Sequence, residues 1–396
     1  MSRIVVTGIG VISPIGNTVE ENRLSLINGY CGIKPIDPSF PSRFAGKLPF
    51  GQVRISTEEL KNRLQACDAG ITRTTLLALH AFKEAIADSG LTAEKVSDFS
   101  TALIGATTVG GMCLTDQLHS DANNNGEGSE YLSSYDCASI NIYLHSRYKM
   151  KGINNTINTA CSSSANAIMY GARLIKNGIV KRAVVGGVDS ISKFTINGFN
   201  SLYILSPEIC TPFDKDRKGL NLGEAGAFLV LEKEEDTAGK KVYAALTGYC
   251  NANDAYHPSS LSESGDGPYL SMKGALDQAG LLPDHIDFIN AHGTATDNND
   301  QVESNAILRL FTAPPPFAST KSNTGHTLGA SGALEAVYSV LNLSNQEMYP
   351  SLNFTNPIDT TGLIPVLTYT KTTLNQVMSN SFGFGGNCTS LIFTKA

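Results

Sequence analysis

Short runs of aliphatic and β-branched residues alternate with longer amphipathic stretches along this chain, and this alternation limits its fold more than any other feature. The runs include RIVVTGIGV, STALIGATTV, NNTINTA and KRAVVGGVD before residue 190, and GAFLVLE, KVYAALTGY, IDFINAHG and NCTSLIFTKA after residue 220. Amphipathic helical patterns lie between them, as in residues 75–91 and 332–343. Strands that alternate with helices predict βαβ units and largely parallel sheets that helices cover on both faces. The sequence therefore predicts an α/β fold.

The length of the chain predicts two domains. A chain of 396 residues exceeds what one ordinary core accommodates, and domains of about 150–200 residues are typical. The segment EEDTAGKK, near residues 235–241, is charged and contains a glycine, as inter-domain connections often do. We therefore expect one domain over residues 1–240 and a second over residues 241–396.

Charge and cysteine usage exclude several classes of protein. The net charge is −6 and no Lys/Arg-rich run occurs, which argues against a nucleic-acid binder. No segment approaches the roughly 20 apolar residues that a membrane span needs, and the first residues lack the signal-peptide pattern. The eight cysteines form no CxxC pair, so neither a disulfide framework nor a metal site is expected. These features predict a cytoplasmic globular protein without a membrane or metal site.

The segment TACSSSANAIMYGARLIKNG, residues 159–178, has the pattern of a helix with Cys161 in its first turn. A thiol reacts only as the thiolate, and the N-terminus of a helix lowers a thiol pKa. A cysteine in this position can equally be a small residue of the core. The hypothesis of a nucleophile therefore depends on finding its catalytic partners elsewhere in the chain.

Two of the seven histidines occur in a setting that suggests such partners. His292 ends a predicted strand and enters a Gly/Thr turn in NAHGTATDNND, while Lys321 and His326 precede a long helix in TKSNTGHTLGASGALEA. Glu335 follows nine residues after His326. Sites in α/β folds form at the carboxyl ends of strands. One histidine at a strand end is usually structural, but two histidines, a lysine and a helix-capping cysteine together favour a catalytic site.

These motifs, in this order, resemble those of the elongating β-ketoacyl-acyl-carrier-protein synthases, the condensing enzymes of the thiolase fold. The resemblance covers nearly the whole chain, through RIVVTGIGVISPIGNT, NTACSSSANAI, PFDKDRKGLNLGEAGAFLVLE, NDAYH, NAHGTAT, TKSNTGHTLGASGALEA and NSFGFGGNCTSLIF. It implies an α/β architecture of two pseudo-equivalent halves in α-β-α-β-α layers. It also implies an acyltransferase that takes substrates on the phosphopantetheine arm of an acyl carrier protein and needs no cofactor.

The resemblance implies a catalytic role for each motif. Cys161 would attack an acyl thioester, and the backbone N–H groups of Cys161 and Phe384 would form the oxyanion hole. His292 and His326 would hold the malonyl thioester carbonyl and stabilise the enolate that remains after CO₂ leaves. The reaction implied is a decarboxylative Claisen condensation in fatty-acid or type II polyketide or aryl-polyene chain elongation.

Three further groups are implied by the resemblance. Lys321 and Glu335 match a buried ion pair that orders the His326 loop, although a solvated surface pair is the simpler interpretation of these two residues. The residues that match the pantetheine-binding positions are Thr294, Thr296 and Ser259. The residues that match the acyl pocket are Val109, Phe199 and Phe384, the last as a gate at its mouth.

The chain also departs from the family pattern. Asp297 replaces a proline, which leaves Asp300 as the matching acid, and Asn387 and Cys388 follow the FGFGG turn where relatives have Thr-Asn. The segment RLQACDAG is nearly uncharged where relatives carry a basic surface for the carrier. The cations that remain as docking candidates are Lys61, Arg63, Arg73, Arg217 and Lys218. This change suggests a dedicated carrier in a specialised pathway.

Three other functions compete with the condensing enzyme. A non-catalytic chain-length partner of a synthase heterodimer would resemble the family but lack the nucleophile, whereas Cys161 is present. A thiolase would use a second cysteine near the C-terminus, and Cys388 is close to that position. A cysteine peptidase would leave His326 unexplained. Family members dimerise through the strand before the nucleophile, here NNTINTA, so a homodimer is expected and a heterodimer with a chain-length partner is possible.

Overall fold

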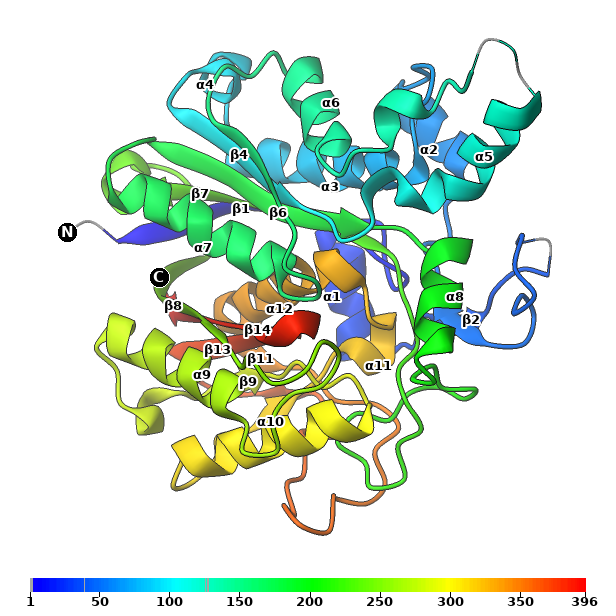
Figure 1. Ribbon diagram of the computed structural model, residues 1–396. Coiled ribbons are helices and arrows are strands. Elements are labelled where there is room, and N and C mark those ends of the chain that lie inside the picture. The colour runs from blue at the N-terminus through cyan, green and yellow to red at the C-terminus, as the bar shows by residue number, and fades with distance from the viewer. Residues whose placement is uncertain (1–2, 39, 125, 127) are drawn as a thin grey trace.

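The structure, a computed structural model, describes residues 3–38, 40–124, 126 and 128–396 (Figure 1). The described residues form one ten-stranded sheet in the order β10-β9-β13-β14-β8-β1-β7-β6-β4-β5. The strands of the first half are β1 Ile4–Ile12, β4 Thr101–Ala106, β5 Asn154–Ile157, β6 Arg182–Asp189 and β7 Ala225–Lys233. Those of the second half are β8 Ala244–Asn253, β9 Phe288–Asn290, β10 Phe317–Ala318, β13 Gln376–Gly383 and β14 Asn387–Lys395. Two-stranded sheets are formed by β2 Ile33–Pro35 with β3 Pro49–Gly51, and by β11 Glu347–Met348 with β12 Thr370–Lys371.

The two halves of the large sheet have the same strand order and the same strand directions. Strands β1, β7, β6, β4 and β5 occupy the places that β8, β14, β13, β9 and β10 occupy in the second half. In each half the first two neighbouring pairs are antiparallel and the last two are parallel. The prediction of pseudo-equivalent halves is confirmed. We propose to divide them at residues 240/241, between the end of β7 and the start of β8.

The prediction of largely parallel sheets is wrong, because both halves are mixed. Strands β7 and β14 each run antiparallel to both of their neighbours in the middle of a half. Strand β7 is buried except for its last residue, and its first seven residues, AGAFLVL, are a continuous apolar run like that of a parallel strand. Strand β14, NCTSLIFTK, is buried from its second to its seventh residue although threonine and serine interrupt its apolar residues. A continuous apolar run indicates that a strand is buried on both faces, but it does not indicate whether the neighbouring strands run parallel or antiparallel to it.

Helices and half-sheets stack in five layers (Figure 1). Helix α3 covers the outer face of the first half-sheet, α7 and α12 lie between the half-sheets, and α9 covers the outer face of the second. The helices are α1 Val19–Ile27, α2 Thr57–Leu64, α3 Arg73–Ser89, α4 Ala93–Ser97, α5 Thr115–Asn124, α6 Ser139–Arg147, α7 Ser163–Lys176, α8 Lys193–Ser201, α9 Asp266–Ala279, α10 Asp297–Leu310, α11 Lys321–Thr324 and α12 Ser331–Asn345. In the described part of the chain no helix combines the length and apolar character of a membrane span.

The contact between α7 and α12 brings the chemically important segments together. At Gly332 a Cβ atom would lie only 2.7 Å from the backbone N of Ala165, so the two helices can approach this closely only with glycine there. The backbone N–H of Ala333 donates a hydrogen bond of 2.8 Å to Ser164 Oγ. Both contacts lie near the helix N-termini. The turn that carries Cys161 is therefore fixed beside the segment that carries His326.

Candidate active site

Cys161 lies on a sharp turn that leads into α7. Ala160 has a φ of +52°, an uncommon conformation for a residue with a Cβ atom. Ser163 stabilises the turn, because its Oγ donates to Ala160 O at 2.5 Å and accepts from Thr159 N at 2.9 Å. Helix α7 begins at Ser163 with Ser162 as its N-cap, so Cys161 precedes the helix instead of lying in its first turn. The serines that follow Cys161 thus help to shape the turn.

Burial controls the charge state of Cys161. The residue is 6% exposed, and burial raises the pKa of its thiol to about 11. The charge of Lys321 and hydrogen bonds from the backbone N–H groups of Phe384 and Cys161 act in the opposite direction. The backbone N–H groups thus act in the direction expected for the start of a helix, but desolvation outweighs them and the net pKa shift is upward. The thiol is protonated at neutral pH.

The same two backbone N–H groups are those that the resemblance implies for an oxyanion hole. Both the Phe384 and the Cys161 N–H point to the Cys161 sulfur. The adjacent Gly383 allows this approach, since a Cβ atom there would lie 2.6 Å from Thr159 O and 3.1 Å from Cys161 N. Donors placed in this way can stabilise negative charge on a carbonyl oxygen bound to the sulfur.

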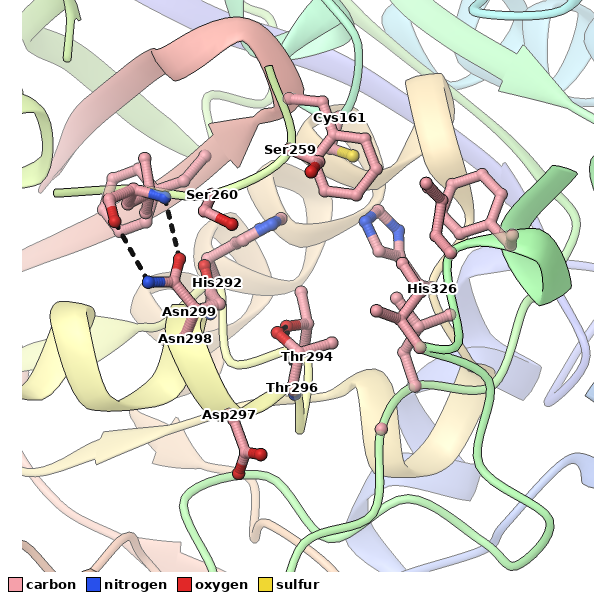
Figure 2. Close-up of a pocket in the computed structure, with 18 of the residues that line it drawn as sticks. Cys161, Ser259, Ser260, His292, Thr294, Thr296, Asp297, Asn298, Asn299 and His326 are labelled. Atoms are coloured by element: carbon pink, nitrogen blue, oxygen red, sulfur yellow. Dashed lines mark hydrogen bonds between the residues drawn. The ribbon is translucent and has the colours of Figure 1, made fainter. Parts of the chain in front are cut away.

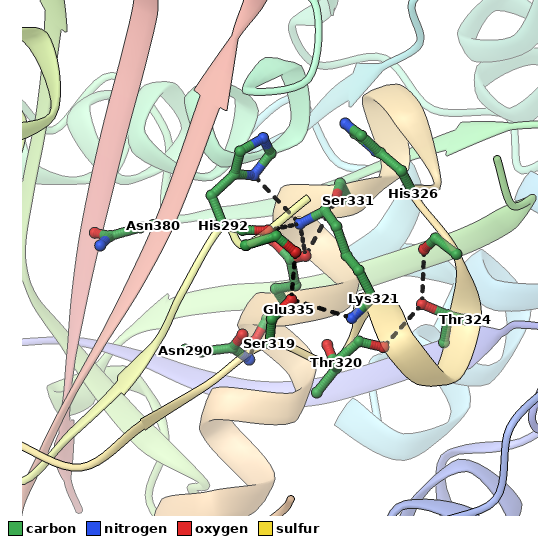
Figure 3. A network of polar contacts seen from close by, with 12 residues as sticks. Asn290, His292, Ser319, Thr320, Lys321, Thr324, His326, Ser331, Glu335 and Asn380 are labelled. Atoms are coloured by element: carbon green, nitrogen blue, oxygen red, sulfur yellow. Dashed lines mark hydrogen bonds and ion pairs between the residues drawn. The ribbon is translucent and has the colours of Figure 1, made fainter. Parts of the chain in front are cut away.

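The His292 imidazole is held by a buried ion pair (Figure 3). Lys321 Nζ lies 3.2 Å from His292 Nδ1, donates to His292 O at 2.5 Å and pairs with Glu335. Lys321 and Glu335 are each 2% exposed, so the predicted buried pair is present and the solvated alternative is excluded. Its direct contact is with His292, whereas we expected it to order the His326 loop. An ammonium group has no acceptor, so His292 Nδ1 accepts and the imidazole proton lies on Nε2.

The His326 imidazole is held by the backbone. Leu328 N–H donates to His326 Nδ1 at 3.1 Å, which also places the proton on Nε2. Burial and the charge of Lys321 hold the pKa of both imidazoles well below the ordinary histidine value. Their rings are perpendicular, with centroids 5.4 Å apart, and both project into the same cavity (Figure 2). The site therefore offers two neutral imidazoles as Nε2–H donors.

One cavity of about 370 Å³ brings together most of the residues that the sequence singled out. Its lining includes Cys161, His292, His326, Thr294, Thr296, Ser259 and Phe384. Thr294 and Thr296 share a hydrogen bond of 2.9 Å between their hydroxyls. In the view of Figure 2 these threonines lie between the histidines and Asp297. Their position suits an extended polar chain that approaches Cys161 through the cavity.

A second cavity, of about 390 Å³, contains all three residues predicted for an acyl pocket. Val109, Phe199 and Phe384 line it, together with Leu328. Phe199, Phe384 and Cys161 line both cavities, and the two aromatic rings stack with centroids 5.9 Å apart. The thiol thus lies where the cavities meet, beside a pair of stacked phenylalanines.

Glu303, on α10, supports the site, although the sequence did not single it out. Its two oxygens accept hydrogen bonds of 2.9 Å from the backbone N–H groups of His292 and Gly293. Burial raises the pKa of this carboxyl to about 7. Asp300, three residues earlier, accepts from the backbone N–H of Ala295 in the same turn. The sequence contains a signal for these supports, because Asp300 and Glu303 are three residues apart on one helix face shortly after the HGTAT motif.

Asp189, at the end of β6, is the second support that the sequence did not reveal. The buried carboxylate accepts from Thr107 Oγ1 at 2.7 Å and from Thr108 N at 2.9 Å, next to Val109 in the wall of the second cavity. It also accepts from Gly329 N at 2.7 Å, the residue after Leu328. One carboxylate therefore anchors both the wall of the second cavity and the turn that holds His326.

The departures at positions 387 and 388 lie outside the two cavities. Cys388 is fully buried in an apolar cluster with Leu261, Val302 and Phe382, and burial raises its pKa. Asn387 interacts with Asn251, through a side-chain hydrogen bond of 3.4 Å. Cys388 is therefore a core residue and offers no second thiol to the site. Among the described residues, no group of three or more His, Cys, Asp or Glu side chains is arranged to hold a metal ion.

Comparison with known proteins assigns the family. Residues 1–237 match the family model described as "Beta-ketoacyl synthase, N-terminal domain", and residues 243–355 match "Beta-ketoacyl synthase, C-terminal domain". The chain belongs to the β-ketoacyl synthase family. The 3-oxoacyl-[acyl-carrier-protein] synthase 2 of Vibrio cholerae is 34% identical over 418 residues, which cover 99% of each chain. The chain is thus an acyl-transferring condensing enzyme of the 3-oxoacyl-acyl-carrier-protein synthase type.

Solved ketosynthases share the whole fold. The ishigamide ketosynthase/chain length factor has a TM-score of 0.94 and 30% identity, covering 100% of this chain and 99% of that one. A ketosynthase solved with its type II polyketide acyl-carrier protein, and bound to the hexaketide, has a TM-score of 0.89 and 25% identity, with full coverage of both chains. The thiolase-like fold of the family is confirmed.

Proposed function

We propose that this β-ketoacyl synthase carries the growing acyl chain on Cys161. The thiol attacks an acyl thioester of the carrier protein, the new Cys161 thioester forms, and the carrier thiol leaves with the proton that the cysteine loses. The oxyanion of the tetrahedral intermediate accepts from the N–H groups of Cys161 and Phe384. The acyl chain then occupies the cavity lined by Val109 and Phe199.

The second step elongates the chain by two carbons. Malonyl thioester binds along Thr294, Thr296 and Ser259, and its thioester oxygen accepts from Nε2–H of His292 and His326. Loss of CO₂ leaves an enolate, whose carbon attacks the Cys161 thioester. The thiolate that is expelled takes up a proton from solvent, so the step consumes one proton and yields the β-ketoacyl carrier, CO₂ and the free thiol. Beyond the pantetheine arm this chemistry uses no cofactor.

One observation carries this proposal: the same cavity contains a buried cysteine with two backbone donors and two neutral imidazoles whose protons lie on Nε2. Neutral N–H donors suit an enolate, which needs hydrogen bonds at its oxygen. A non-catalytic partner subunit has no use for a nucleophile in that position. A thiolase needs a second thiol in the cavity, and Cys388 lies in the apolar core.

We further propose that two chains pair through β5. This strand ends the large sheet, and both Asn154 and Asn155 are exposed at its edge. A homodimer extends the sheet across the interface, and a heterodimer with a chain-length partner uses the same edge. Sedimentation of the purified chain should give a dimer. A monomer that becomes a dimer only with a second ketosynthase-like chain would favour the heterodimer.

We propose the cytoplasm as the place of action, because all eight cysteines are free and suit a reducing compartment. Fractionation of cells that express the protein should recover it with the cytoplasmic enzymes. Recovery with an organelle or an oxidising compartment would contradict this part of the proposal.

Mass spectrometry of the intact protein tests the catalytic proposal. The chain is mixed with a panel of acyl-carrier thioesters, and malonyl-carrier is added afterwards. We expect an acyl adduct that Cys161→Ala lacks, followed by a carrier product longer by two carbons. Absence of an adduct with every acyl group, together with tight binding to an active ketosynthase, would support the partner-subunit alternative.

A further inference from the structure

The rim of the catalytic cavity carries exposed apolar side chains from the segment that follows α8. Leu202 and Tyr203 line the cavity and are also 45% and 94% exposed. A residue can meet both conditions only at the mouth. Ile209 adds an exposed aliphatic side chain farther along the same segment, at 39%. We call residues 202–209 the mouth segment.

The cations that the sequence offered for carrier docking are all paired. The pairs are Lys61 with Glu58, Arg63 with Glu59, Arg73 with Glu224, Arg217 with Asp297 and Lys218 with Glu208. Among the described residues that line the cavity, Arg217 and Lys218 are the cations. A cation next to an acid projects little potential into solvent, so this surface gives weak attraction to an acidic partner.

Arg217 is also poorly accessible to a partner protein. Its side chain is 6% exposed, and its guanidinium donates to the backbone oxygens of Asp214, Thr296 and Asp297. Lys218 is 55% exposed, but Glu208, which belongs to the mouth segment, lies 2.7 Å away. The rim therefore combines neutralised charge with an aromatic and two aliphatic side chains. Exposed apolar residues of this kind around a site typically mark a surface for another protein.

We propose that the mouth segment is the docking surface for the acyl carrier protein and binds an apolar face of that carrier. The inference rests on the proposed function, in which the pantetheine arm enters through this mouth and the carrier body stays outside it. The carrier must therefore cover the rim residues. Tyr203 is the anchor, because a large exposed aromatic at the centre of such a surface contributes most to binding.

Steady-state condensation with two forms of the same substrate tests the inference. Acyl and malonyl groups are supplied either on the carrier or on free pantetheine, and Tyr203→Asn is compared with Phe99→Asn. Asparagine tolerates the φ of +57° at Tyr203. Phe99 is an aromatic residue, 73% exposed, that does not line either cavity, so it is the matched control.

We expect Tyr203→Asn to raise the KM ratio of carrier-bound to free substrate about tenfold, while Phe99→Asn leaves the ratio unchanged. Lys218→Ala and a change from 50 to 300 mM NaCl should each alter the carrier KM less than about twofold. A steep salt dependence or a large effect of Lys218→Ala, with none for Tyr203→Asn, would overturn the inference in favour of docking by charge.

Two further outcomes separate this inference from the function on which it rests. If neither substrate form is turned over, the proposed function fails. If free substrate is turned over normally but Tyr203→Asn changes only the sedimentation of the protein, the mouth segment is an interface between copies of the chain and the docking inference is wrong.

Discussion

His292 and His326 offer the same atom to the cavity, yet they are held by different kinds of partner. His292 Nδ1 faces the Lys321 side chain, which a buried glutamate neutralises. His326 Nδ1 accepts from the backbone N–H of Leu328, in a turn anchored by Asp189. A single substitution can remove a side-chain support, whereas nearly every residue supplies a backbone N–H. His292 should thus depend on local charge, and His326 on the position of its turn.

The largest effect is expected from Lys321→Met, which removes the support of His292. The proton of His292 can then move to Nδ1, so the condensation rate should fall about 10²–10³-fold, as for the loss of a donor to a developing oxyanion. Glu335 loses its buried counter-charge, which should lower the free energy of unfolding by about 3–5 kcal/mol. Product formation and urea unfolding measure the two effects.

The double variant Lys321→Met/Glu335→Leu separates these two effects. Removing both members of a buried pair is often nearly neutral for stability. We therefore expect stability to return towards that of the wild type while the condensation rate stays low. A rate that recovers together with stability would show that Lys321 acts only on the fold, and the distinction between the two histidines would disappear.

Asp189→Asn should disturb the turn that holds His326, and it should lower the condensation rate less than Lys321→Met does. The amide retains one acceptor oxygen but turns an NH₂ group towards donors, so the Leu328–Gly329 turn should shift. A displacement of about 1 Å can cost roughly 10²-fold in rate, and we expect a loss of about 10–100-fold. Val109 N–H is bonded to the same carboxylate. The preferred acyl length should therefore change in this variant.

Lys321→Met is the control for that change in acyl preference. It leaves the acyl pocket wall intact, so the ranking of acyl-carrier substrates should match that of the wild type even though every rate is low. An altered ranking in both variants would mean that the two supports are not independent.

Glu303→Gln should have a moderate effect that depends on pH. The pKa of the wild-type carboxyl is raised to about 7, and the carboxylate accepts more strongly from the His292 and Gly293 N–H groups than the protonated acid does. Wild-type activity should therefore fall several-fold as the pH drops through 7. The glutamine variant should have lower activity above pH 7 and lack this inflection, which a pH–rate profile measures. An unchanged inflection would assign it to another group.

The stability of the protein should depend on pH in the direction opposite to that of its activity. The pKa of Glu303 is raised from 4.5 to about 7, so the native state binds more protons than the unfolded state between these values. The contribution of this group to stability is thus present at low pH and is lost as the pH rises through 7. Denaturant midpoints at pH 6 and 8 should differ less in Glu303→Gln than in the wild type.

The smallest expected effect is on the reactivity of the Cys161 thiol, where the contributions of Lys321 and Asp189 can be compared. The charge of Lys321 lowers the pKa of Cys161, and the charge of Asp189 raises it. Alkylation by iodoacetamide at pH 8 should therefore be a few-fold slower in Lys321→Met and a few-fold faster in Asp189→Asn. Wild-type alkylation should increase with pH without a plateau below about pH 10. Changes of the same sign in both variants would indicate altered access instead of altered charge.

The candidate catalytic residues could be predicted from the sequence because each lies in a compact local motif. Cys161 with its serines, His292 with its Gly/Thr turn, and Lys321 with His326 can all be recognised within a few consecutive positions. The supports could not be predicted in this way. Asp189 lies 140 residues from Gly329 in the chain, and nothing local marks it as an acceptor for that residue.

The sequence by itself determined which side chains are candidates for the chemistry and that the chain folds as α/β, since residue type and apolar periodicity are local properties. Only the tertiary structure decided the mixed strand directions, the protonated state of Cys161, the position of the proton on each imidazole and the neutralisation of the rim cations. Each of these properties depends on which residues surround a group in the folded structure. Desolvation and electrostatic pairing act between residues that the chain separates, and the fold alone brings them together.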